Sequence, residues 1–371
     1  MRASSDPRPR LAVLCAFSGD GGVERVIKLL CAEFAQQVQV DLLAIKLQGQ
    51  HARELPADVR VIELKARHSL TAIPELRRYL QQTPPDAMLV AKDRAGRAAL
   101  SAARWARSPV PIWLQLHSNL SAALAGRSAL SRALRLWPIP RIYPRARGVI
   151  AVSEGVRRDA LAVSRLPASR VHALPNPVYD GTLAQQAAAP VPHPWLAQKQ
   201  GPVVMGIGRL TPQKDFSSLM HAFSRLPPAA RLILLGEGKE RAALTALAQE
   251  LGIAERVLMP GFVPNPYAWL ARADLFVLSS RWEGFGLALA EALALGIPSV
   301  ATDCPSGPGE ILDGGRHGSL VPVADVEALA AAMARTLTQP LPAQALIAAV
   351  QKHRADVSAR QYLNLMFSRD T

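Results

Sequence analysis

Short apolar segments rich in Val, Ile and Leu alternate along the chain with longer Ala-, Leu- and Arg-rich stretches of helical period. This alternation predicts an α/β fold with mainly parallel sheets, because parallel strands need long crossovers that are usually helical. In the first half we expect strands at 11–17, 38–45, 59–64, 87–91, 111–117, 148–153 and 171–176. In the second half we expect strands at 202–208, 230–236, 257–261, 275–280, 298–302 and 319–323. The pattern therefore predicts two doubly wound domains.

The domain boundary is expected near residue 185. Residues 184–202 contain four prolines before the next strand, which is typical of a linker or hinge. The length of 371 residues also fits about two domains. We therefore expect a first domain at 1–185 and a second at 186–353. Residues 354–371 are expected to contribute a last amphipathic helix, at 354–366.

Composition excludes several classes of protein. Hydrophobic residues make up 49% of the chain and charged residues 19%, which excludes global disorder. Three cysteines without C-x-x-C spacing favour neither a zinc site nor a disulfide framework, and a reducing cytosol is the simpler location. The apolar run 11–17 is too short for the core of a signal peptide, and no window of eighteen apolar residues follows it. We expect a cytoplasmic protein that does not cross a membrane.

Positive charge is concentrated in the first half of the chain. The net charge is +14, with 27 basic and 14 acidic residues up to position 190 against 16 and 15 after it. Residues 94–153 contain ten arginines and no acidic residue. Such a balance favours an anionic membrane or another polyanion, although an Arg-rich composition alone would also produce it.

The segment 126–148 mixes these arginines with apolar side chains. Arg132, Arg135, Trp137 and Arg141 fit the headgroup region of an anionic membrane, because basic residues there alternate with aromatic and aliphatic anchors. We expect peripheral docking at the inner face of the cytoplasmic membrane. Two alternatives remain: a helix that packs its Leu/Trp face on the domain core, and attraction to nucleic acid, which rests on charge alone.

Two turns between a strand and a helix have the composition of phosphate sites. Gly21 and Gly22 follow the first strand, and the free amides of a helix start there suit a phosphate. Gly208, Arg209 and Lys214 follow the strand at 202–208, where a guanidinium and an ammonium can bracket a diphosphate. An ordinary glycine turn and a solvated basic turn are the respective alternatives.

The segment 279–303 is the most specific. The strand 275–280 ends, Glu283 stands at the turn, Gly-Phe-Gly is expected to open a helix, and Glu291 follows eight residues after Glu283. Eight helical residues rotate by about 80° beyond two turns, so both carboxylates are expected to face one cleft and to accept sugar or ribose hydroxyls. The amides of Phe285, Gly286 and Leu287 are expected at an anion-binding helix start.

These motifs resemble one known family. The segments GIGRLTPQKD, LILLGEGKERAAL and VLMPGFVPNPYAWLARADLFVLSSRWEGFGLALAEALALGIPSVATD are similar to the C-terminal half of retaining glycosyltransferases of family 4. The GG-x-E-R turn, LQLHSN, VIAVSEGVRRDAL and LPNPV resemble weaker landmarks of the same family. The resemblance implies a GT-B fold, in which two Rossmann-like domains face a central cleft and the last helix crosses back to the first domain.

The resemblance also implies a role for each motif. Arg209 and Lys214 would neutralise the departing diphosphate without a metal, Glu291 would hold the ribose and Glu283 a sugar hydroxyl. The base would lie near Val263, in the segment 261–264. His117, at the end of the strand 111–117, would approach the donor sugar and the acceptor; without the resemblance, a structural histidine is the commoner interpretation.

The predicted function follows from these roles. We expect retaining transfer of a hexose or N-acetylhexosamine from a nucleotide sugar, with UDP favoured over GDP or ADP, to a membrane-associated saccharide of bacterial surface polysaccharide, lipopolysaccharide or lipid-linked oligosaccharide. No cofactor, metal or nucleic acid is expected. The alternative is a non-catalytic partner that binds a sugar nucleotide or a glycan within a polysaccharide assembly complex.

Overall fold

A computed structural model describes residues 7–19, 21–191 and 193–368. Asp20, in the first glycine-rich turn, and Pro192, in the expected linker, lie outside the described residues. The chain forms two compact units. Unit 1 contains the described residues up to Pro177 and those from His353 onward, and unit 2 contains Val178–Lys352.

Unit 1 is built on a seven-stranded parallel sheet with the order β3-β2-β1-β4-β5-β6-β7. The central strands are buried on both faces, which explains their continuous apolar sequences. The strands are β1 (Arg10–Ser18), β2 (Gln39–Gln48), β3 (Val59–Glu63), β4 (Ala87–Ala91), β5 (Ile112–Leu116), β6 (Gly148–Ala151) and β7 (Val171–Ala173).

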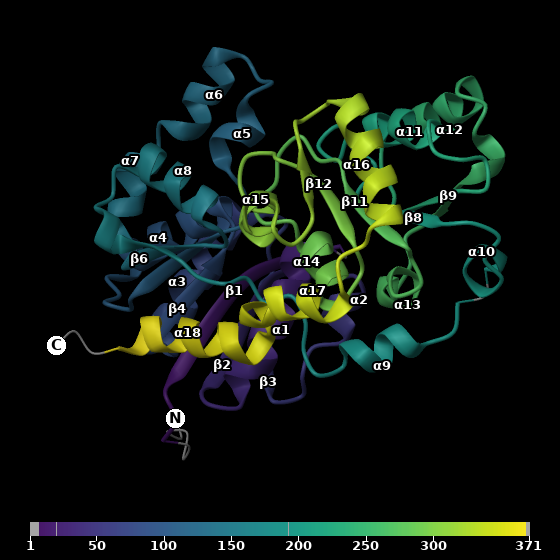
Figure 1. The fold of residues 1–371 in the computed structure, drawn as a ribbon. Helices are drawn as coiled ribbons and strands as arrows, with labels where there is room; N and C mark the ends of the chain where they lie inside the picture. The colour runs from purple at the N-terminus through teal and green to yellow at the C-terminus, as the bar shows by residue number, and fades with distance from the viewer. Residues whose placement is uncertain (1–6, 20, 192, 369–371) are drawn as a thin grey trace. The chain divides into compact units, whose positions relative to one another are not determined.

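Helices connect successive strands of unit 1 (Figure 1). The α-helices are α1 (Gly22–Ala35), α2 (Gln50–Arg53), α3 (Ile73–Gln82), α4 (Asp93–Ala106), α5 (Leu120–Leu124), α6 (Ala129–Leu136), α7 (Ile139–Ile142), α8 (Glu154–Ser164) and α18 (Ala355–Phe367). Short 3-10 turns of unit 1 are η1 (Ser69–Ala72), η2 (Tyr143–Arg145) and η3 (Ala168–Arg170), and η6 (Gln351–His353) spans the point at which the chain re-enters unit 1 at His353.

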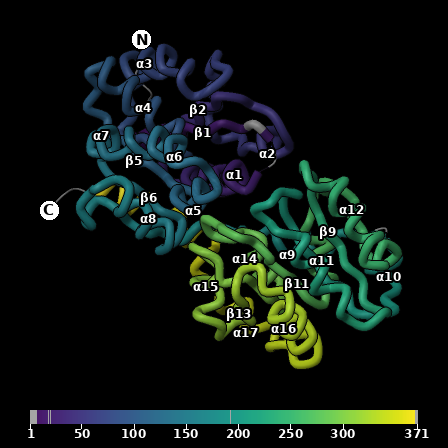
Figure 2. Tube along the Cα trace, turned by 90° about the horizontal axis from the view of Figure 1, so that it is seen from above, coloured from purple at the N-terminus to yellow at the C-terminus, as the bar shows by residue number. Residues whose placement is uncertain are grey.

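Helix α18 joins unit 1 although it follows unit 2 in the sequence. Figure 1 shows it beside α1, and in Figure 2 the yellow tube of this helix is seen among the elements of unit 1. Tyr362 is fully buried, its ring lies 6.4 Å from that of Phe34, and its hydroxyl accepts a hydrogen bond from Gln115 of β5. The last helix therefore completes the core of unit 1.

Unit 2 contains a six-stranded parallel sheet with the order β10-β9-β8-β11-β12-β13. Its core joins Leu and Val side chains of the strands to Phe216, Leu219 and Phe223 of α11. The strands are β8 (Val203–Ile207), β9 (Arg231–Leu235), β10 (Val257–Gly261), β11 (Leu275–Leu278), β12 (Ser299–Thr302) and β13 (Ser319–Val321).

Its helices are α9 (Leu183–Ala188), α10 (Pro194–Ala197), α11 (Phe216–Ser224), α12 (Arg241–Glu250), α13 (Pro266–Leu270), α14 (Leu287–Ala294), α15 (Pro308–Ile311), α16 (Val326–Thr338) and α17 (Ala343–Ala349), with 3-10 turns η4 (Ala254–Arg256) and η5 (Asp313–Gly315).

The predicted fold class is confirmed, since both sheets are parallel and each expected strand is present. The segment expected to be a linker is different in the structure. It contains α9 and α10 and belongs to unit 2, where Asn265 donates to the Gln186 carbonyl and Arg272 donates to the Ala187 carbonyl. Proline-rich composition resembles a linker, but these side chains bind its main chain to α13. The units separate at Pro177/Val178 rather than near residue 185.

Candidate functional site

Two neighbouring strands of unit 2 place the predicted donor residues at one edge of the sheet. The strand order reverses between β8 and β11, which are adjacent although β9 and β10 lie between them in sequence. Loops leave the carboxyl ends of such strands in opposite directions, and ligands of doubly wound sheets bind in the crevice between them. Gly208, Arg209 and Lys214 follow β8, and Glu283 follows β11.

Lys214 and Glu283, predicted from separate motifs, form an ion pair at this edge. The Lys214 Nζ atom lies 2.6 Å from Glu283 Oε1, and both side chains are largely buried. The hydroxyl of Ser280 donates to the same carboxylate oxygen at 2.7 Å. The carboxylate therefore fixes the position of the ammonium, a pairing that the sequence did not predict.

Further hydrogen bonds join the two loops. The Ser279 hydroxyl donates to the Lys214 carbonyl at 2.7 Å. The Gln213 side-chain amide donates to the Trp282 carbonyl at 2.9 Å, and the Arg281 main-chain amide donates to the Gln213 carbonyl at 2.8 Å. These bonds hold the loop after β8 against the loop after β11.

Glycines let the main chain and Lys214 come close together. A Cβ atom on Gly208 would lie 2.7 Å from Cε of Lys214, and one on Gly236 would overlap the Gly208 carbonyl oxygen. A larger residue at either position would displace the loop that carries the ammonium. Arg209 is exposed, and no hydrogen bond or ion pair joins its guanidinium to another described side chain.

The helix after β11 begins later than the predicted helical rotation from Glu283 to Glu291 requires. Helix α14 begins at Leu287, with Gly286 before it at φ +100°, so Glu283 lies in the preceding turn. A helical rotation between the two carboxylates therefore does not apply, and that part of the prediction is wrong. Glu291 lies within α14 and is 4% exposed, and Phe285 is also buried. The amides of Gly286 and Leu287 lie at the helix start as expected.

Cys304 lies close to the ion pair in this loop region. Burial, together with the Glu283 carboxylate, raises the pKa of the Cys304 thiol to about 12, so it stays protonated at neutral pH. Val263 is half-buried beyond the end of β10. Among the described residues, no group of three or more His, Cys, Asp and Glu side chains is arranged to hold a metal ion.

The sheet of unit 1 has a second reversal, between β1 and β4. Gly21 caps α1 and Gly22 is its first residue, so the predicted glycine turn leads directly into a helix. Glu24, in the first turn, is 4% exposed and pairs with Lys92 at 2.9 Å. Lys92 follows β4 with φ 75° and ψ 141°, a backbone conformation that residues other than glycine rarely adopt. Lys92 was not predicted as a site residue, because its only signal in the sequence was its position after a strand.

His117 follows β5 in the same sheet, one strand beyond β4. The side chain as a whole is half-buried, but its Nε2 atom is enclosed and has no hydrogen-bond partner among the described residues. Burial, assisted by the Lys92 ammonium, lowers the pKa of His117 to about 3. The imidazole is therefore neutral at physiological pH, and one nitrogen has no partner in the described part of the chain.

The predicted membrane residues are exposed. Arg132, Arg135 and Arg141 lie on the surface of α6 and α7, and Trp137 is 63% exposed. The alternative in which the Leu/Trp face packs on the domain core is wrong, because no residue of α6 is buried. No helix in the described part of the chain is long and apolar enough to span a bilayer.

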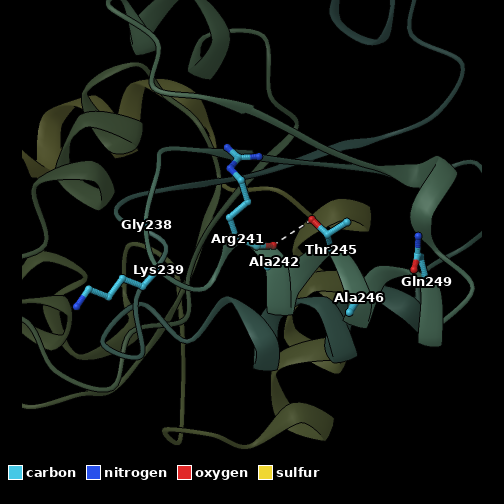
Figure 3. A pocket seen from close by; sticks show the side chains of 7 residues that line it. All are labelled: Gly238, Lys239, Arg241, Ala242, Thr245, Ala246 and Gln249. Atoms are coloured by element: carbon cyan, nitrogen blue, oxygen red, sulfur yellow. Dashed lines mark hydrogen bonds between the residues drawn. The ribbon is translucent and has the colours of Figure 1, made fainter.

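A shallow hollow in unit 2 is lined by residues other than the predicted ones. It is lined by Gly238, Lys239 and one face of α12, including Thr245 and Gln249. Figure 3 shows the Lys239 and Arg241 side chains pointing in different directions, with the Thr245 hydroxyl bonded to the Arg241 carbonyl. Its polar groups do not converge on one point, so we assign it no ligand.

Two sequence profiles match the chain. Residues 20–180 match the profile described as Glycosyltransferase Family 4, and residues 192–353 match Glycosyl transferases group 1. The chain belongs to glycosyltransferase family 4. The GT-B expectation is confirmed with it, since both parallel sheets have the expected topology.

Similar proteins are named for related reactions. The chain is 32% identical over 185 residues to the N-acetylgalactosamine-N,N'-diacetylbacillosaminyl-diphospho-undecaprenol 4-alpha-N-acetylgalactosaminyltransferase of Campylobacter jejuni, covering 50% of this chain and 49% of that protein. It is 23% identical to the lipopolysaccharide 1,6-galactosyltransferase of Escherichia coli, covering 84% of each. The chain spans half or less of the length of the curated relatives it matches first.

A solved structure shares the fold of this family 4 chain. Alr3699/HepE of Anabaena, in complex with UDP and glucose, matches with a TM-score of 0.81 over 97% of this chain and 100% of that one, at 21% identity. At this identity the likeness shows the fold alone.

Proposed function

We propose that the chain is a retaining glycosyltransferase. It moves a hexose or N-acetylhexosamine from a nucleotide sugar, with a UDP-sugar as the first candidate, to a membrane-associated saccharide in bacterial surface polysaccharide, lipopolysaccharide or lipid-linked oligosaccharide synthesis. The observation that carries the proposal is the Lys214–Glu283 pair at the β8–β11 reversal, in a chain that belongs to family 4. The names of the Campylobacter and Escherichia relatives, and the UDP bound to the Anabaena protein, support the acceptor class and the donor.

In this proposal unit 2 binds the donor. Arg209 and Lys214 neutralise the diphosphate, so the positive charge needed by the leaving group comes from side chains rather than from a metal. Glu291 accepts hydrogen bonds from the ribose, and Glu283 accepts one from a sugar hydroxyl while it holds the Lys214 ammonium. The remaining donor contacts in unit 2 are the amides of Phe285, Gly286 and Leu287, the main chain at Gly208, and Val263, beside which the base lies. In unit 1, Gly21 and Gly22 offer a phosphate site.

The transfer breaks the bond between the sugar C1 and the diphosphate oxygen and forms a bond from C1 to an acceptor hydroxyl oxygen. Attack on the face that the leaving group departs from retains the anomeric configuration, and the departing phosphate accepts the hydroxyl proton. We assign His117 to the acceptor and donor sugar, since its neutral ring has a buried nitrogen that no described residue hydrogen-bonds. The protein acts in the cytoplasm, at the inner face of the membrane.

Donor binding and turnover test this function. A thermal-shift panel of UDP, GDP, ADP and their sugar conjugates should give a selective shift with one nucleotide, because a ligand at 100 times its Kd stabilises the folded state by about 2.7 kcal/mol. Lys214→Ala should then lower donor hydrolysis or transfer by about tenfold or more. Lys352→Ala, which removes an exposed lysine of the same unit, should leave the rate unchanged.

Two results would contradict the proposal. A folded protein that responds to no nucleotide would favour a non-catalytic partner in a polysaccharide assembly complex. A Lys214→Ala variant as active as Lys352→Ala would remove Lys214 from the diphosphate site.

A further inference from the structure

Helix α6 of unit 1 carries an apolar face that no other described part of the chain covers. Leu130 is 71% exposed, Leu134 67% and Trp137 63%. Residues four and seven positions apart lie on one side of a helix, so these three side chains form one face. Isolated exposed apolar residues are ordinary, but three large ones on a single face mark an interaction surface.

The rest of the helix is polar and basic. At 100° per residue, Arg132 and Arg135 lie on the side opposite Leu130 and Trp137. The hydroxyl of Ser128 caps the helix by accepting from the Ser131 amide, so the helix is defined locally although it buries nothing. A short helix with an aliphatic and aromatic face and a basic face suits the boundary between lipid headgroups and acyl chains.

The charged residues that flank α6 in the sequence are all arginines. The Arg141 guanidinium lies over the Trp137 ring, 4.3 Å from its centre, and donates to the Trp137 carbonyl. Residues 94–153 contain no Asp or Glu. The face therefore complements a negative surface, and a basic side chain stands directly beside its aromatic anchor.

We propose that α6 lies in the headgroup layer of an anionic bilayer and inserts Leu130, Leu134 and Trp137 among the acyl chains. This rests on the proposed function, whose acceptor is held at the membrane, and adds that apolar insertion, not arginine charge alone, anchors the enzyme. Pairing of α6 with a second copy through this face is disfavoured, because a symmetric contact would bring the Arg141 guanidinium that lies over Trp137 in each copy toward the same group in the other.

Vesicle flotation of the full-length protein tests the insertion. The probes are vesicles of phosphatidylcholine alone and of phosphatidylcholine with phosphatidylglycerol at about a third of the lipid, each over a range of salt. Wild type should float with the anionic vesicles and at least tenfold less with the neutral ones. Leu130→Ser/Leu134→Ser/Trp137→Ser should reduce flotation with anionic vesicles at least tenfold even at low salt.

A matched variant controls for the loss of exposed apolar side chains. Leu70→Ser/Trp105→Ser changes two side chains of unit 1 that are 71% and 60% exposed, on η1 and near the end of α4. It should float like wild type. Arg132→Ser/Arg135→Ser/Arg141→Ser should float at low salt but lose binding at lower salt concentrations than wild type, since only its electrostatic attraction is reduced.

Three outcomes would overturn the inference. In the first, the wild type does not float with anionic vesicles. In the second, the triple apolar variant floats as well as the wild type. In the third, the wild type forms a dimer in sedimentation velocity, the triple apolar variant does not form it, and neither protein floats. UDP binding to each variant, by calorimetry, separates this from the proposed function. Intact UDP binding with lost flotation supports the insertion, whereas flotation without UDP binding would count against the proposed function alone.

Discussion

Ser280 is a positioning residue for the ion pair of unit 2. It is fully buried, and its hydroxyl donates to the Glu283 oxygen that also accepts from Lys214. Hydrogen bonds to charged groups contribute about 1.5–3 kcal/mol. We predict that Ser280→Ala lowers kcat for the donor by about fivefold or more, because the carboxylate and the ammonium lose their fixed position, with a smaller change in KM. Steady-state kinetics on the UDP-sugar that gives the thermal shift would measure this.

Two variants separate positioning from general destabilisation. Ser280→Thr keeps the hydroxyl and should recover most of the rate. Ser299 is an equally buried serine at the start of β12, where its hydroxyl donates to the Ile297 carbonyl at the other edge of the sheet. Ser299→Ala should lower stability without lowering kcat, and a loss of kcat as large as that of Ser280→Ala would refute the positioning role.

His117 makes the stability of unit 1 depend on pH. Its folded-state pKa is about 3, against an ordinary value of 6.5, because burial and Lys92 disfavour the charged ring. Below about pH 6.5 the His117 ring therefore binds a proton in the unfolded chain but not in the folded chain. Proton binding stabilises the unfolded chain, so the free energy of unfolding falls as the pH drops from about 6.5 toward 3. We predict that between pH 7 and pH 4.5 this free energy falls by about 1–2 kcal/mol less in His117→Asn than in wild type.

Urea unfolding at the two pH values, followed by circular dichroism, would measure the difference. His68→Asn removes an exposed histidine of the same unit and should behave like wild type. Equal slopes for wild type and His117→Asn would show that the ring is accessible to protons in the folded chain.

Residue types in sequence were sufficient to propose the donor residues, but not their contacts. The spacing of Glu283 and Glu291 marked both as candidates, whereas the ion pair of Glu283 with Lys214 depends on β8 lying beside β11. Nothing local in the sequence encodes that neighbour, because the two residues are 69 positions apart. Lys92 was missed for the same reason, since its partner Glu24 lies on another element.

At the scale of elements, Gly307, which caps α15, packs against the loop that precedes α14. It has φ +95°, and a Cβ atom there would overlap the Phe285 carbonyl oxygen. Gly314 has φ +64° but would meet nothing within 4 Å. We predict that Gly314→Ala lowers the free energy of unfolding by only about 1 kcal/mol, the cost of left-handed backbone. Gly307→Ala should cost at least twice that and also weaken UDP binding, because Phe285 must move.

Thermal unfolding and calorimetry of UDP binding would compare the two variants. Equal losses of stability, or unchanged UDP affinity in Gly307→Ala, would show that the loop accommodates the methyl group without moving Phe285.

Strands were easier to predict than loops and linkers. Buried parallel strands such as β4 and β5 are continuous apolar runs, so their sequence is itself the signal. The start of α14 was placed too early because Gly286 adopts a left-handed conformation that composition does not reveal. The segment with α9 resembled a linker because the side chains that bind its main chain, those of Asn265 and Arg272, come about eighty residues later in the sequence.

At the scale of the whole molecule, the chain leaves unit 1 at Pro177 and returns at His353. The His353 ring is hydrogen-bonded to the Asn176 carbonyl, so the departing and returning segments meet inside unit 1. Sequence periodicity predicted a last helix, and the family resemblance assigned it to the first domain. Periodicity alone could not do so, because an amphipathic face does not name its partner.

This connectivity predicts that two positions on successive α-helices of the sequence, α17 and α18, stabilise different units. Tyr362 is fully buried in unit 1 against Phe34 and Gln115, whereas Leu346, on α17, is fully buried in unit 2. Tyr362→Ala should remove about 3–5 kcal/mol and Leu346→Ala about 2–5 kcal/mol from the unit that each belongs to. In scanning calorimetry of the full chain, UDP should raise only the transition of unit 2. Leu346→Ala should then lower that UDP-sensitive transition, and Tyr362→Ala should lower the other. If both variants lower the same transition, the last helix does not fold as part of unit 1.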